Sequence, residues 1–153
     1  MKLGVFTPVL YAQPLEKALE YLHSRGVQMA EIGVGGCPGD KHCKPGELLE
    51  DPAKLAEFQE LFRKNEIEIS ALSAHGNPVH PDPDQAAMYD KVITDAILLA
   101  EKLGLHQINT FSGCPGDHPG AKYPNWVVCP WPNDFLKVLD YQWNEVLIPY
   151  WQK

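Results

Sequence analysis

The sequence of 153 residues lacks long apolar runs and an excess of basic residues, and each shortage excludes a class of protein. No stretch approaches the roughly 20 consecutive apolar residues that a membrane-spanning helix needs. Acidic residues outnumber basic ones, the net charge is −7, and the basic clusters typical of nucleic-acid surfaces are lacking. We therefore expect no membrane partner and no nucleic-acid partner.

The N-terminal segment is apolar over residues 3–12 but lacks the features of a signal peptide. Pro8 interrupts the run, and only one basic residue precedes it. A buried first strand is the better interpretation of the same residues. The sequence therefore predicts a cytoplasmic location.

Cysteine is scarce, with four residues and no Cys-x-x-Cys pair. A chain of this size can bury a core without disulfides, so we expect reduced thiols. Two of the cysteines lie in an exact repeat, because Gly36–Asp40 and Gly113–Asp117 have the same sequence, GCPGD. Each copy follows a predicted strand, which places both at the edge of a sheet where α/β folds have their active sites.

The repeat admits two interpretations. Its cysteines and nearby histidines could bind zinc across the two loops, as a set made of Cys37, His42, Cys43, Cys114 and His118. Alternatively, each copy is a tight Pro-Gly turn whose cysteine packs as a small apolar group. The spacing fits no known zinc finger and favours the turns.

Strand and helix patterns alternate without interruption along the chain. Apolar runs predict strands at 3–10, 29–34, 67–74 and 107–111, and helical spacing predicts helices at 15–25, 51–65, 88–103 and from 133 onward. Long polar loops are expected at 35–50 and 112–132. This order predicts an α/β protein with a parallel sheet.

The architecture can be an open four-stranded sheet or half of an eight-stranded barrel. Open doubly wound sheets usually have a Gly-rich turn after the first strand, and the residues after Phe6 contain none. A TIM barrel needs about 250 residues. We therefore predict a parallel (βα)4 half of a TIM barrel.

Four segments of the chain resemble a known barrel family. LGVFTP at 3–8, AEIGVGG at 30–36, ISALSAHGNPVHP at 69–81 and INTFSG at 108–113 resemble the first four strands of the xylose isomerase-like family. The resemblance implies that residues 1–153 are the N-terminal part of a single barrel domain. It further implies a metal-dependent sugar or sugar-phosphate isomerase or epimerase, which abstracts a proton next to a carbonyl group.

The resemblance also implies a cofactor and partners. A divalent metal such as Mn²⁺ would be held by residues of the later strands, outside this chain, so the isolated chain should be inactive. The substrate would be a small carbohydrate. Because a half-barrel leaves its outer strands unpaired, we also expect a homo-oligomer.

Four residues near strand ends are candidate substrate contacts: Phe6, Glu31, His75 and Phe111. Charged and aromatic residues at strand ends of such barrels are typical of substrate pockets. Glu31 has an equally good interpretation as a structural carboxylate that joins neighbouring strands. His75 could instead be a loop histidine that binds nothing.

Three other functions stay open. The closing segment 141–153 resembles metal-dependent subunits that cleave C-glycosides. An endonuclease IV-type DNA-repair enzyme belongs to the same barrel family, but it needs further strand-end histidines and a positive pocket, which this sequence lacks. A non-catalytic half-barrel that self-associates is the third alternative.

Overall fold

The computed structural model describes residues 1–153, and the chain divides into two compact units. The first unit comprises Met1–His75 and Val92–Thr110, and the second comprises Gly76–Lys91 and Phe111–Lys153. The prediction of a single barrel domain therefore stays a prediction.

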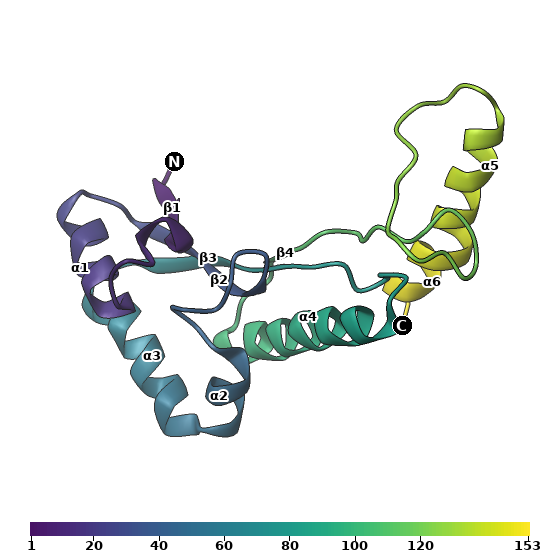
Figure 1. Ribbon diagram of the computed structural model, residues 1–153. Helices are drawn as coiled ribbons and strands as arrows, with labels where there is room; N and C mark the ends of the chain where they lie inside the picture. The colour runs from purple at the N-terminus through teal and green to yellow at the C-terminus, as the bar shows by residue number, and fades with distance from the viewer. The chain divides into compact units, whose positions relative to one another are not determined.

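The first unit contains the whole sheet (Figure 1). Its elements are β1 (Gly4–Phe6), the 3₁₀ helix η1 (Thr7–Leu10), α1 (Leu15–Ser24), β2 (Met29–Gly36), α2 (Pro45–Glu50), α3 (Pro52–Lys64), β3 (Glu68–His75), β4 (Ile108–Asn109) and the second half of α4 (Pro83–Leu103). The four strands are parallel and follow the order β1-β2-β3-β4. The predicted α/β class and parallel (βα)4 arrangement are confirmed.

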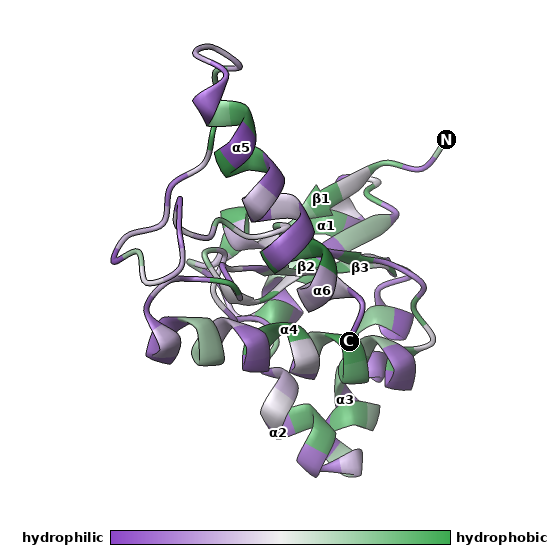
Figure 2. Ribbon diagram, turned by 90° about the vertical axis from the view of Figure 1, so that its right-hand side faces the viewer, coloured by the Kyte–Doolittle hydropathy of each residue, from purple (hydrophilic) through white to green (hydrophobic).

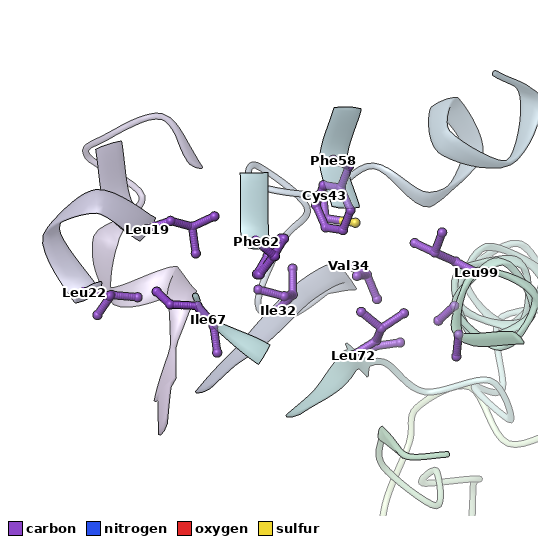
Figure 3. Packing of buried hydrophobic residues seen from close by; sticks show 14 of the residues in the cluster. Leu19, Leu22, Ile32, Val34, Cys43, Phe58, Phe62, Ile67, Leu72 and Leu99 are labelled. Atoms are coloured by element: carbon purple, nitrogen blue, oxygen red, sulfur yellow. The ribbon is translucent and has the colours of Figure 1, made fainter. Parts of the chain in front are cut away.

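The core of the first unit lies between the sheet and its helices (Figure 3). Leu19 of α1, Ile32 of β2, Leu72 of β3 and Leu99 of α4 are all fully buried. Burying one such side chain contributes about 1.5–3 kcal/mol to folding. Because these helices join one common core, they cover one face of the sheet, as in a barrel, whereas a doubly wound sheet has helices on both faces.

Several expected elements are wrong in detail. The strand expected at 107–111 is only Ile108–Asn109, and the helix expected at 88–103 begins earlier, at Pro83. The strand predicted at 3–10 ends at Phe6, and Thr7–Leu10 form the 3₁₀ helix η1. Pro8 explains the early end, because proline has no N–H for a strand ladder and fits the first turn of a helix. The loop predicted at 35–50 contains the helix α2 at its end.

The start of α3 is as predicted. Asp51 is its N-cap, and the Asp51 carboxylate accepts hydrogen bonds from the N–H groups of Ala53 at 2.9 Å and Lys54 at 3.2 Å. Pro52 occupies the first turn, where no N–H is needed. The helix α4 buries Ile93 in the core, whereas Met88 is about half exposed.

The second unit contains a helical run in three parts. They are α5 (Asp134–Asp140), the π-helix η2 (Tyr141–Leu147) and α6 (Ile148–Trp151). Pro149 cannot donate to an α-helical ladder, yet after the wider π turns of η2 the helix continues through it to Trp151. In Figure 2, α5 carries both hydrophobic and hydrophilic residues. No helix in the structure has the length and apolar character needed to span a bilayer.

Candidate functional site

One face of the sheet is not covered by the core helices α1, α3 and α4; we call it the uncovered face, although η1 and Tyr11 pack on it at Gly33. Side chains alternate between the two faces of a strand. Val5, Ile32, Ala74 and Ile108 pack toward the helices. Their neighbours on the other face are Phe6, Glu31, Gly33, Ser73, His75 and Asn109. This uncovered face therefore carries a carboxylate, a hydroxyl, an imidazole and an amide, which is unusual for a face that could pack as a core.

Glu31 is tied to the neighbouring strand. The Ser73 hydroxyl on β3 donates a hydrogen bond to the Glu31 carboxylate on β2, and Ser73 is fully buried. A bulge at Ser70 shifts the register, so that Ala30 pairs with Ile69 and Glu31 with Ala71. The bond supports the interpretation of Glu31 as a carboxylate that joins two strands, while its contact with substrate stays a prediction.

Phe6 and His75 lie at the carboxyl ends of their strands. Phe6 is the register partner of Glu31, so these two predicted site residues are neighbours on β1 and β2. His75 pairs with Gly36, and its carbonyl accepts a hydrogen bond from the N–H of Cys37 at 2.7 Å. Phe111 belongs to the second unit, where its side chain is 55% exposed.

The first GCPGD copy is a tight turn at the end of β2. Gly36 and Gly39 have φ values of +70° and +75°, which favour glycine, and the Gly39 N–H donates to the Gly36 carbonyl at 3.0 Å. The Tyr11 hydroxyl donates to the Gly39 carbonyl at 3.0 Å. A Cβ on Gly33 would lie 2.7 Å from the Tyr11 hydroxyl, so the turn and Tyr11 pack directly on the sheet.

His42 and Cys43 follow the first copy and are both buried. Nε2 of His42 lies 2.9 Å from the Gln13 carbonyl, and its ring packs edge-on against Tyr11 at 4.7 Å. Burial and, to a lesser extent, the nearby Asp40 charge raise the pKa of Cys43 to about 12. Cys43 thus behaves as a small apolar group, in line with the turn interpretation.

The second GCPGD copy is held differently, although its sequence is identical. The Asn77 side chain pairs with the backbone of Cys114: its amide N–H donates to the Cys114 carbonyl at 2.7 Å, and its oxygen accepts from the Cys114 N–H at 2.8 Å. Gly113 has a φ of +110°, and a Cβ there would lie 2.5 Å from Val79. Local context therefore decides the conformation of this pentapeptide.

The cysteines and histidines proposed as zinc ligands do not form a complete zinc site within either unit. Neither unit brings together three or more His, Cys, Asp or Glu side chains that could hold a metal ion. His118 is instead bonded to Asp117, with 2.7 Å between Nδ1 and the carboxylate. Zinc binding across the two loops stays a prediction.

Sequence reasoning missed two residues, Ser73 and Asn77. Ser73 reaches the uncovered face only because the bulge at Ser70 resets the alternation of β3. No residue type in that strand signals the bulge. Asn77 could have been found, because it lies between Gly76 and Pro78, where asparagine often hydrogen-bonds to backbone groups.

Comparisons with known proteins give a relative by sequence and likenesses to solved structures. No family model matches the chain. The uncharacterised protein YfiH of Bacillus subtilis (strain 168) is 35% identical over 156 residues. The alignment covers 100% of this chain and 49% of YfiH, so the chain spans about half the length of this curated relative.

One structural likeness is to a crystal structure of the probable 3-DHS dehydratase AsbF from Bacillus anthracis, which is involved in petrobactin synthesis. The two chains are 19% identical, and the TM-score is 0.49. The match covers 76% of this chain and 40% of AsbF.

Proposed function

We propose that residues 1–153 form the first half of a xylose isomerase-like barrel that acts on a carbohydrate. The proposed reaction is the metal-dependent isomerisation or epimerisation of a sugar or sugar phosphate, by removal of a proton next to a carbonyl group. The observation that carries the proposal is the polar face that α1, α3 and α4 leave uncovered on a parallel sheet whose strands follow the order β1-β2-β3-β4.

This face would become the interior of a completed barrel. Barrel interiors are usually filled with valine, isoleucine and leucine. Here the corresponding positions include Glu31, Ser73 and Asn109. Burying such groups costs free energy unless they are hydrogen-bonded, so their presence favours an interior that binds a polar molecule.

The individual side chains suit a sugar. In this proposal, Phe6 packs against the apolar C–H face of the ring, and Glu31 accepts a hydrogen bond from a hydroxyl group of the substrate. Ser73 keeps the Glu31 carboxylate in one orientation through its hydrogen bond. Glu31 and Ser73 together thus bind and orient the sugar without themselves supplying the reactive base.

The residues of this chain do not make up the metal site by themselves, because neither unit gathers three suitable ligands. We propose that the divalent metal, Mn²⁺ or a similar ion, is held by residues outside this chain. The isolated chain would then bind sugar weakly and turn nothing over.

Solvent deuterium exchange tests the proposal without knowledge of the product. The longer protein that contains residues 1–153 is incubated with Mn²⁺ and a panel of ketoses, aldoses and their phosphates in D₂O. We expect NMR to detect deuterium at the carbon next to the carbonyl group of one substrate. The 153-residue chain alone should give none.

A matched pair of variants assigns the activity to the uncovered face. Glu31→Gln should lower kcat/KM at least about 10-fold, because it weakens a hydrogen bond to the substrate. Glu57→Gln, an exposed glutamate on α3, should leave kcat/KM unchanged. Equal activity of the two variants, or no exchange with any sugar, would contradict the proposal.

A further inference from the structure

The second unit contains a cleft of about 310 Å³ between the loop that follows β4 and the helix α5. Its lining is of two kinds. Asp117 and Asn125 provide polar groups, and Trp126, Phe135 and Val138 provide an apolar wall. A concave site with an apolar lining and a few polar groups is typical of small-molecule binding.

The loop that forms one wall is held in place by Gln142. This side chain is fully buried, and its amide N–H groups donate to the carbonyls of Asn125 at 2.9 Å and Gly116 at 3.2 Å. The Asn125 N–H donates in turn to the Pro115 carbonyl at 3.0 Å. Gln142 lies in the π-helix η2, and π turns frequently occur at functional sites. The cleft therefore has a fixed frame although its loop has no regular secondary structure.

The polar lining of the cleft includes the carboxylate of Asp117, which already has one hydrogen-bond partner. His118 Nδ1 lies 2.7 Å from Asp117 Oδ1. This hydrogen bond to His118, with a smaller contribution from Asn125, lowers the pKa of Asp117. The carboxylate oxygens keep acceptor capacity beyond this one bond, which suits a hydroxyl donor.

The apolar end is an aromatic wall. The Trp126 ring packs edge-on against Trp143, with 5.4 Å between the ring centroids and an angle of 82°. Phe135 on α5 is 42% exposed next to it. A cleft lined by aromatic rings together with a carboxylate and an amide matches a molecule that has an apolar C–H face on one side and hydroxyl groups at its edge.

We propose that this cleft binds a neutral pyranose carbohydrate, with its ring against Trp126 and its hydroxyl groups on Asp117 and Asn125. The site is formed by residues of the second unit alone, and none of them belongs to the uncovered face of the sheet. Binding of a sugar at this site involves no chemical reaction. Binding here can therefore succeed or fail independently of the proposed enzymatic reaction.

Saturation-transfer NMR on the 153-residue chain tests this binding site. The probes are methyl β-glucopyranoside, methyl β-galactopyranoside and methyl β-xylopyranoside, with choline as a cationic comparison. We expect transfer to at least one glycoside and a change in tryptophan fluorescence on titration. Choline should give neither signal.

Variants locate the bound sugar. Asp117→Asn should weaken the affinity for the glycoside about 10-fold, since a hydrogen bond to a charged group is lost. Glu145→Gln, an exposed residue of η2 outside the cleft lining, should bind as the unaltered chain does. Thermal melts followed by circular dichroism verify that both variants are folded.

Three results would overturn the proposal. They are the absence of transfer to all three glycosides in the folded unaltered chain, stronger binding of choline than of any glycoside, and equal affinity of the Asp117→Asn and Glu145→Gln variants. Because the unaltered chain alone can give the first two results, the test stands even if a variant fails to fold.

Discussion

At the scale of single residues, Cys43 links stability to pH. Its pKa is raised from 9.0 to about 12 by burial, so the folded state keeps the thiol proton where the unfolded state loses it. The free energy of unfolding should therefore be unaffected by Cys43 below about pH 9 and fall above it, by up to about 1.4 kcal/mol per pH unit.

Urea unfolding of the unaltered chain and of Cys43→Ala at about pH 8, 9 and 10 measures this effect. Cys43→Ala should remove most of the decline between about pH 9 and 10, whereas Cys129→Ala, at an exposed position, should keep it. Identical slopes in all three proteins would show that Cys43 is not buried as described.

The helix cap at Asp51 gives a second prediction, about the free energy of unfolding. The chain also contains a control position, a residue before a helix that makes no cap bond. Asp51→Ala should lower the free energy of unfolding by about 1 kcal/mol, since two N–H groups of α3 lose their acceptor. Asn133 precedes α5 without any side-chain cap bond, so Asn133→Ala should cost much less. Urea titration compares the two, and a larger loss for Asn133→Ala would contradict the capping assignment.

At the scale of elements, the sequence predicted best where one local signal decides. The helix predicted at 51–65 does begin there, with an N-cap aspartate and a proline, and continuous apolar runs located β2 and β3. The first strand was predicted too long, because its apolar residues continue past Pro8 into η1. Long-range contacts were not predicted. Nothing in the sequence of the loop at 35–50 indicates that the carbonyl of Gly39 accepts a hydrogen bond from Tyr11.

For the candidate site too, the sequence indicated single residues but not their contacts. Glu31 stood out as a charge in an apolar strand, and Phe6 and His75 stood out as strand ends. Their mutual placement depends on strand register, which a single sequence does not reveal. The partner of Glu31, Ser73, depends on the bulge at Ser70 and was therefore missed.

A pair of glycine variants tests whether Tyr11 and the first GCPGD turn pack on strand β2. Gly33→Ala should lower the urea midpoint, because the new Cβ would lie 2.7 Å from the Tyr11 hydroxyl and 3.0 Å from the Gly39 carbonyl. A Cβ added to Gly46, in α2, would have no heavy atom within 4 Å, so Gly46→Ala should stabilise by roughly 0.5–1 kcal/mol. Stabilisation by Gly33→Ala would show that Tyr11 does not pack on the sheet.

At the scale of the whole molecule, the sheet has two open edges. β1 and β4 each pair with only one strand, and exposed edges promote association between chains. We therefore propose that the 153-residue chain self-associates, and light scattering after size-exclusion chromatography should show a dimer or larger species. A stable monomer with a cooperative melt would contradict this expectation.

The central claim is that the four parallel strands are one half of a closed barrel. A crystal structure of a chain in which the proposed second half follows residues 1–153 tests it most directly. The account predicts a parallel strand hydrogen-bonded to β4 at Ile108–Asn109, another to β1 at Gly4–Phe6, and Glu31 and Ser73 inside the closed barrel. Helices packed over Phe6, Glu31 and Ser73, or an antiparallel strand on either edge, would contradict it.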